Sequence, residues 1–257
     1  HDKQLSLREL YPIRFGYLAF KKVDIKGGNL SQGQQKSGTA LVANLGSRPI
    51  AVKFSDVSEG LSLKISPNPV PANSTAKISF TVTADRHHWG KNYYYATPLV
   101  DGRQYKAVVD KSGEKEPVAA GTEAIVADPN PELGAGKSRI GIFTYTKENF
   151  SNLTEKERND GPNPMADEST FSFGKVKAGT KVDCKFTFTN KGKSPFGIYK
   201  VDSESSHVKA KAFADVPAGG KGDLEVTFDT KGFPAGECLI VLTLTTNSPL
   251  RPIINLY

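Results

Sequence analysis

The chain has 257 residues, a formal net charge of +7, 37% hydrophobic and 24% charged residues. This length exceeds that of one typical domain, so two globular domains are expected. No apolar run approaches the roughly 18 residues of a membrane-spanning helix, so we expect no transmembrane segment in this chain. Lysines and arginines are scattered singly among acidic residues, without the basic stripe that follows a phosphate backbone, which argues against nucleic acid as a partner.

The chain begins at His1 rather than at a methionine, which we interpret as a processed or cut start. A signal peptide or lipid anchor before it would then be missing from this sequence. The two cysteines, Cys184 and Cys238, both lie in the second half, and no Cys-x-x-Cys pair indicates a zinc site. Free, half-buried thiols are favoured, and a disulfide between two sheets is the alternative.

An internal repeat organises the chain. Turn residues of the first half recur 146 positions later: Asn44, Gly46 and Pro49 match Asn190, Gly192 and Pro195, Val70-Pro71-Ala72 matches Val216-Pro217-Ala218, and Gly90 matches Gly236. Turns demand particular residues because glycine, proline and asparagine adopt backbone angles that others avoid, whereas a core accepts many apolar residues. Two divergent copies of one fold are therefore expected to keep their turns.

Between these turns, apolar and polar residues alternate. Val182, Cys184, Phe186 and Phe188 share one face of a predicted strand, and the residues between them are polar. The same alternation occupies 50–54, 78–82, 224–228 and 240–244. Short strands with one apolar face, separated by turns and not by helices, predict sandwiches, because only a second sheet covers such a face.

The chain order gives three parts. Residues 1–110 are predicted to form an immunoglobulin-like β-sandwich, with a loop insertion rich in Gly, Gln and Ser near 22–35, and residues 168–257 a second sandwich of the same kind. Residues 111–167 are predicted to form a mixed connector with a strand over 139–146 and one short helix, which a capping-box pattern opens at Thr154. The predicted fold class is all-β, two sandwich domains in tandem with a connector.

No catalytic constellation is evident. The sequence has no Gly-x-Ser-x-Gly elbow and no cysteine with an evident histidine partner. His87 and His88, just before Gly90, are candidate ligands of a transition metal. Consecutive side chains of an extended segment point to opposite faces, however, and the sequence offers no third metal ligand nearby. We therefore predict no catalytic, cofactor-binding or metal-binding residue, no cofactor, and a protein that is not an enzyme.

The aromatic run from Trp89 to Tyr95 is the candidate for ligand recognition, because exposed aromatic rings form rigid anchors for protein or sugar. Tyr94 corresponds to Ile240 in the repeat and is expected in the core, so Tyr93 and Tyr95 are expected to face outward. The predicted ligand-binding residues are Trp89, Tyr93 and Tyr95. The alternative is that the outward tyrosines pack across strands or against the connector.

The second half resembles a known family. The resemblance is carried by five stretches: Phe171-Ser-Phe-Gly174-Lys-Val176, Phe186-Thr-Phe-Thr-Asn190-Lys-Gly192, Val216-Pro-Ala-Gly219, Phe228-Asp-Thr-Lys-Gly232 and Thr246-Asn247. They are similar to uncharacterised bacterial immunoglobulin-like domains related to the ASH, hydin and PapD-like sandwiches, found in exported proteins of gut-commensal bacteria. Members often carry a Cys-Gly-Cys-Thr element where this chain reads Ser203 to His207, so no thiol or metal role carries over.

The resemblance implies a seven-stranded ASH/PapD-like sandwich and an exported protein, periplasmic or at the cell surface, with lipid anchoring through a missing segment as a further option. It implies no activity. Our leading hypothesis is a non-catalytic structural or protein-interaction module of the cell envelope, presenting loops or a sheet edge to another envelope protein. The alternative is a glycan-binding module that uses the aromatics near Trp89.

Overall fold

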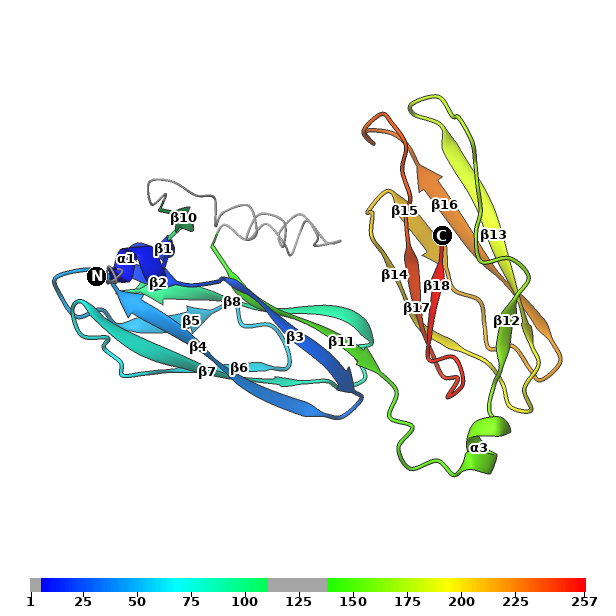
Figure 1. Ribbon diagram of the computed structural model, residues 1–257, viewed down its shortest axis with the longest axis horizontal. Helices are drawn as coiled ribbons and strands as arrows, with labels where there is room; N and C mark the ends of the chain where they lie inside the picture. The colour runs from blue at the N-terminus through cyan, green and yellow to red at the C-terminus, as the bar shows by residue number, and fades with distance from the viewer. Residues whose placement is uncertain (1–5, 111–137) are drawn as a thin grey trace, which may run out of the picture. The chain divides into compact units, whose positions relative to one another are not determined.

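The computed structural model describes residues 6–110 and 138–257. The chain divides into two compact units, His1–Asp85 with Asn92–Thr144, and Arg86–Lys91 with Tyr145–Tyr257. Both are built of β-strands that are mostly antiparallel, with β3 and β11 of the first unit running in the same direction (Figure 1), so the protein has the expected all-β sandwich fold. Residues 111–137 of the predicted connector lie outside the described residues. The described helices, α1 (Leu7–Leu10) and α3 (Glu155–Asn159), are both far too short to cross a membrane.

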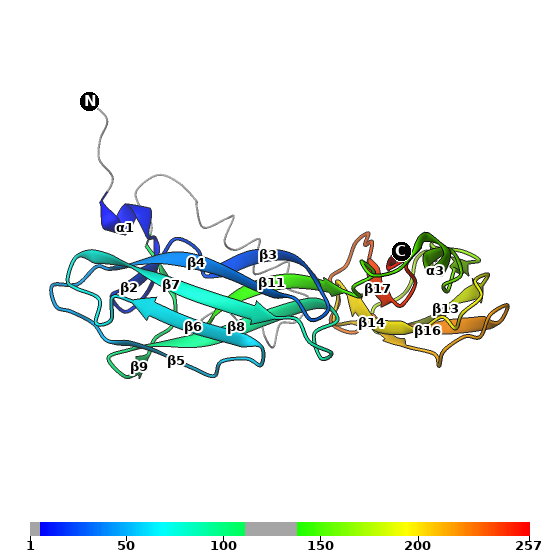
Figure 2. The same ribbon diagram turned by 90° about the horizontal axis from the view of Figure 1, so that it is seen from below.

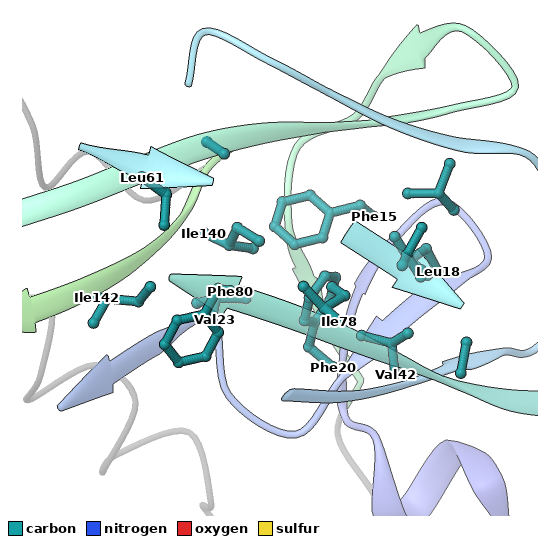
Figure 3. Packing of buried hydrophobic residues seen from close by; sticks show 14 of the residues in the cluster. Phe15, Leu18, Phe20, Val23, Val42, Leu61, Ile78, Phe80, Ile140 and Ile142 are labelled. Atoms are coloured by element: carbon teal, nitrogen blue, oxygen red, sulfur yellow. The ribbon is translucent and has the colours of Figure 1, made fainter. Parts of the chain in front are cut away.

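The first unit has two sheets, with strand orders β10-β1-β2-β4-β7-β6 and β3-β11-β8-β5, and β9 pairs with β8. In chain order the strands are β1 (Ile13–Phe15), β2 (Leu18–Phe20), β3 (Asp24–Ser31), β4 (Gln35–Asn44), β5 (Val52–Ser55), β6 (Leu61–Ser66), β7 (Ser74–Thr83), β8 (Gly90–Val100), β9 (Arg103–Gln104), β10 (Val108–Val109) and β11 (Ile140–Lys147). Both sheets contribute to one core, where Phe15, Phe20, Ile78 and Ile142 meet (Figure 3).

The second unit has a sheet of order β12-β13-β16-β15 and a sheet of order β14-β17-β18 (Figures 1 and 2). Its strands are β12 (Pro164–Ala166), β13 (Lys181–Asn190), β14 (Ile198–Ser203), β15 (Val208–Lys211), β16 (Lys221–Asp229), β17 (Leu242–Thr246) and β18 (Ile253–Leu256). The apolar residues of both sheets form a single core that includes Phe188, Leu224, Leu244 and Leu256. The alternation predicted for β13 is confirmed, since its apolar residues line this core.

The two sandwiches repeat one pairing scheme at the spacing of 146. β4 pairs with β7 with Asn44 near Ser74, and β13 pairs with β16 in the equivalent register, with Lys181 opposite Asp229 as Gln35 is opposite Thr83. β2 pairs with β4 as β12 pairs with β13. β12 is therefore the counterpart of β2. The predicted connector over 111–167 is therefore wrong for residues 164–166, which are a strand of the second sandwich; their equivalence to β2 lies in the backbone register and not in residue identity.

The predicted loop insertion near 22–35 is also wrong. Its residues 24–31 form β3, an edge strand next to β11. Gly27 does not mark a turn: a Cβ added there would lie 2.8 Å from side-chain carbons of Ile142 and Thr144, so glycine permits the close approach of β11. The predicted connector strand is β11 itself, a member of this sheet, because its apolar residues complete the first core.

The short helix is confirmed as α3, with Thr154 as its N-cap. The Thr154 hydroxyl accepts a hydrogen bond from the Glu157 amide, and the Glu157 carboxylate accepts one from the Thr154 amide, as the capping box requires. Helix α1 was not predicted. It is a single turn capped by the Ser6 side chain, and a turn of that length leaves no periodic pattern in a sequence.

One buried asparagine closes the same turn in each sandwich. The Asn44 amide donates to the carbonyls of Arg48 (2.7 Å) and Val70 (3.1 Å), and its oxygen accepts from the Gly46 amide (2.9 Å). Asn190 makes the equivalent three bonds, to Ser194, Val216 and Gly192, at 2.8, 3.0 and 3.0 Å. Both asparagines are fully buried. We call this three-bond arrangement the asparagine bracket.

Replacing Asn190 by alanine is expected to destabilise the second unit by about 2–4 kcal/mol, because the carbonyls of Ser194 and Val216 and the amides of Gly192 and Asn163 each lose a hydrogen bond. Trp89 is the single tryptophan of the chain and belongs to this unit, so its fluorescence during urea unfolding measures the change. The control is Lys191→Ala, an exposed neighbour, which is expected to shift stability by less than about 0.5 kcal/mol. Equal midpoints for the two variants would refute a stabilising role of the bracket.

Candidate functional site

Trp89, the first predicted ligand-binding residue, lies in the second unit and stacks on Tyr199. The ring centroids are 4.0 Å apart and the planes 4° apart. The Tyr199 hydroxyl donates to Glu148 Oε2 at 2.8 Å, and burial, followed by this carboxylate, raises the pKa of Tyr199. Beside this pair, the Lys91 amide donates to the buried carboxylate of Asp202 at 2.9 Å. One face of the Trp89 indole is therefore already covered by protein.

Tyr93 lies outside the core that holds Tyr94, as expected, but it is not exposed to solvent, since only 9% of it is accessible. Its ring packs on Phe143 of β11 at a centroid distance of 4.6 Å, and its hydroxyl donates to Asp24 Oδ1 of β3 at 2.7 Å. Gly141 leaves the space for this ring, since a Cβ there would lie 2.1 Å from it. The residue is buried by β3 and β11, two strands that the sequence did not assign to this sheet, so the alternative of packing across strands and against the predicted connector holds for Tyr93.

Tyr95 is half-buried, and its ring lies under the Arg139 guanidinium, 4.3 Å from the ring centroid. The Tyr95 carbonyl accepts a hydrogen bond from the Ser58 amide, and the Tyr95 amide donates one to the Ser58 hydroxyl. The structure thus brings Tyr93 and Tyr95 together, with ring centroids 6.1 Å apart, but leaves Trp89 in a different unit. Ligand binding by the three residues stays a prediction.

Tyr94 is in the core as expected, 1% exposed, with its hydroxyl donating to the Thr83 carbonyl at 3.2 Å. Burial, followed by the charge of Asp85, raises the pKa of Tyr94 to about 12.

The raised pKa of Tyr94 predicts a loss of stability at high pH. The unfolded tyrosine ionises near pH 10, whereas the folded one holds its proton to about 12. The contribution of protonated Tyr94 to the free energy of unfolding is therefore complete below pH 10 and is lost as the pH rises to 12. Urea unfolding followed by circular dichroism between pH 9 and 12 should show a shallower fall for Tyr94→Phe than for the unmodified chain. Tyr17→Phe, at a 58% exposed position, should leave the slope unchanged.

The backbone that leads into β17 is an open part of the second sandwich. We call residues 237–240 the open edge. They lie outside any strand, and their backbone groups make no hydrogen bond within the part of the chain that the structure describes. Leu239 is 69% exposed, and Ile240 is only half-buried against the core. Figure 1 shows the chain before β17 continuing beyond the end of β18.

The repeat shows what this edge lacks. Residues 92–94 of β8 correspond to 238–240, so Leu239 is the counterpart of Tyr93 and Ile240 of Tyr94. In the first unit β8 lies between β11 and β5, and both tyrosines are buried. β18 pairs with β17 only from Leu242 to Thr245. The open edge is thus a position in the fold where the first repeat has a neighbouring strand and the second has none among the described residues.

The other outer strands of the second sandwich are protected against pairing. β12 has three residues and begins with Pro164, and β15 carries Lys209 and Lys211 among its four residues. β14 is interrupted by a register shift after Ile198. At the end of β18, Tyr257 pairs in both directions with residues 169–171. Short length, proline, lysine and bulges are the means by which natural sheets block edge pairing.

The cysteines are both free, as the favoured prediction has it, but the predicted half-burial holds for Cys184 and is wrong for Cys238. Cys238 lies in the open edge and is exposed, whereas Cys184 of β13 is half-buried against the core. Burial, followed by the charge of Asp183, raises the pKa of the Cys184 thiol. No group of three or more metal-ligating side chains occurs among residues 6–110 and 138–257, and His87 and His88 form no such group.

The two thiols are expected to differ in reactivity. At pH 8 a disulfide reagent should modify Cys238 first, and Cys184 more slowly, because the reactive thiolate of Cys184 is less accessible and less populated. Cys184→Ala and Cys238→Ala variants assign the two kinetic phases. A single phase of equal rate for both thiols, or no free thiol before denaturation, would contradict this arrangement.

Comparison with known proteins agrees with an uncharacterised domain family. Residues 165–255 match the family described as "Protein of unknown function (DUF1573)". The match covers the second sandwich and not the first. None of the curated proteins matches the sequence.

Among solved structures, a protein of unknown function from Porphyromonas gingivalis W83 has a TM-score of 0.60 at 13% identity, covering 95% of this chain and 97% of that one. At this identity the likeness extends to the fold alone. The endo-fucoidan hydrolase MfFcnA4_H294Q (8% identity, 94% of this chain, 28% of that one) has a TM-score of 0.26, and the secreted serine protease VesC of Vibrio cholerae (9% identity, 88% and 49%) one of 0.27. Scores this low say nothing about a shared activity.

Proposed function

We propose that the protein is a non-catalytic interaction module of the cell envelope, which binds an extended segment of a partner protein at the open edge. Binding of this kind, β-augmentation, gains affinity from main-chain hydrogen bonds and specificity from alternate side chains. The observation that carries the proposal is the exposed, unpaired backbone of residues 237–240 at a sandwich whose other outer strands are protected.

The composition of the open edge supports the same function. Leu239 is the most exposed of the large hydrophobic residues described. A leucine side chain that becomes buried contributes about 1.5–3 kcal/mol, so an added strand that covers Leu239 gains both apolar burial and backbone pairing. In the first unit the equivalent gain is made inside the chain, where β11 and β3 cover Tyr93.

The strand order supports an immunoglobulin-like assignment for the second sandwich. Four strands, β12-β13-β16-β15, face three, β14-β17-β18. Named A to G in chain order, they give the ABED and CFG sheets of constant-type immunoglobulin domains. Modules of this architecture are common in exported proteins, and we retain an exported, periplasmic or surface location as part of the proposal.

The glycan-binding alternative is less well supported. It depends on exposed aromatic faces near Trp89, and Tyr93 is buried while Trp89 is covered on one face by Tyr199.

A peptide with the sequence of residues 139–147, which covers the equivalent positions of the first unit, is a direct probe of the open edge. In a Cys184→Ala background we expect the peptide to slow modification of Cys238 in a saturable manner. Leu239→Asp should weaken this binding about ten- to a hundredfold, because the apolar contact of Leu239 is lost.

The matched control is Leu250→Asp, which changes an exposed leucine of the same unit outside the open edge and is expected to leave binding unchanged. Peptides with N-methyl groups on alternate residues separate backbone pairing from apolar adsorption, since only one of the two methylated sets removes the donors that face the edge. Equal binding to both leucine variants, or no protection of Cys238 by any peptide concentration, would refute the proposal.

A further inference from the structure

The open edge has one accessible side. On the side of β14, the Val241 carbonyl accepts a hydrogen bond from the Glu204 amide at 3.2 Å, and the Val241 amide donates to the Glu204 carboxylate at 3.3 Å. Backbone groups of successive strand residues point to opposite sides. The amides and carbonyls of Ile240 and Cys238 therefore point to the side of β18, where no described residue pairs with them.

β18 defines the line that an added strand would follow. It runs antiparallel to β17, with Leu242 opposite Leu256 and Thr245 opposite Ile253. Leu256 is fully buried in the core, whereas Ile253 is 42% exposed on the outer face. Extending this register gives four positions, opposite Ile240, Leu239, Cys238 and Glu237 in that order along the added strand. The first and third face the core, and the second and fourth face outward.

The core is incompletely covered at this end. Phe228 of β16 contacts the rings of Phe173 and Phe233 at 5.4 and 5.1 Å, and Val182 pairs with Phe228 in the sheet. Phe173, Phe233 and Val182 are all only partly buried, as is Ile240. By contrast, Phe188, Leu244 and Leu256 of the same core are fully buried. Apolar side chains at the two core-facing positions would cover this end.

From this geometry we infer the chemistry of the partner, an inference that rests on the proposed function. The partner segment is a strand antiparallel to β17, in line with β18, that reads apolar, apolar, apolar, basic from its N-terminus. The first and third residues cover the core, the second packs beside Leu239, and the fourth lies opposite Glu237. Glu237 is exposed and forms no ion pair among the described residues, so it favours a lysine or arginine.

Register is tested by thiol exchange with Cys238. The probe is the peptide Ser-Thr-Val-Tyr-Val-Lys-Thr-Ser, in which Val-Tyr-Val-Lys occupies the four positions, used on the full chain in the Cys184→Ala background. Each of the four positions is replaced in turn by cysteine activated as its 2-thiopyridyl disulfide. The Cys238 thiolate displaces 2-thiopyridone, whose absorbance reports the new disulfide between protein and peptide.

The peptide activated at the third position is expected to react at least about tenfold faster than those activated at the second and fourth, because only a directly opposite pair has disulfide geometry. A peptide of reversed sequence, activated at the same valine, serves as the control for orientation. With Glu237→Lys, the peptide that carries glutamate in place of lysine should bind about two- to fivefold better than the lysine peptide, reversing the order found for the unmodified chain.

The outcomes separate the two proposals. If the 139–147 peptide protects Cys238 but exchange is equally fast at all positions or fastest for the reversed peptide, the edge binds a strand and the inferred register is wrong. If neither peptide protects Cys238, both the inferred partner and the proposed function are wrong. If sedimentation of the chain alone shows a dimer that Leu239→Asp dissociates, the edge pairs with a second copy and the inferred partner is wrong.

Discussion

The buried asparagine bracket is the interaction on which both sandwiches depend. In each, one amide side chain joins the last residue of a strand, β4 or β13, to the turn that follows it and to the carbonyl of a valine 26 residues further on, Val70 or Val216. That valine also bridges to the residue after the turn, Ile50 or Phe196. A buried carbonyl without a partner costs more than an ordinary hydrogen bond gains. The bracket therefore fixes the turn at which the chain crosses from one sheet of the sandwich to the other.

The two units share one pairing scheme but differ in the strands that flank β8 and its counterpart β17. The first adds β3 and β11 to the sheet that holds β8, and their side chains bury Tyr93. In the second, β17 lies between β14 and β18, no described strand continues the line of β18 past Leu242, and Leu239 at the equivalent position stays exposed. The internal contrast matters because it compares two versions of one fold within a single chain. It identifies the open edge by what covers its counterpart, independently of any likeness to other proteins.

The sequence predicted the repeat, the all-β class and helix α3, because asparagine, glycine and capping residues have strict backbone requirements at single positions. It did not predict β3, because a strand with Gly27 and Gly28 reads as a loop when the neighbour that needs the space is unknown. The burial of Tyr93 was missed for a related reason: alternation assigns a side chain to a face, but only the strand order decides whether that face is covered. The open edge was missed altogether, since residues 240–244 read as one continuous strand.

An open edge of four residues is too small to hold a partner by its backbone alone. Ile240 and Cys238 offer at most four main-chain hydrogen bonds, each with a net value of about 1 kcal/mol, and covering Leu239 adds roughly 2 kcal/mol. Association costs about 4–15 kcal/mol in lost freedom, so these terms approximately cancel. Indiscriminate pairing with any exposed strand is therefore weak. The surplus has to come from side chains that enter the uncovered end of the core beside Phe173 and Phe233, which makes the sequence of the incoming strand, and not its backbone, the determinant of binding.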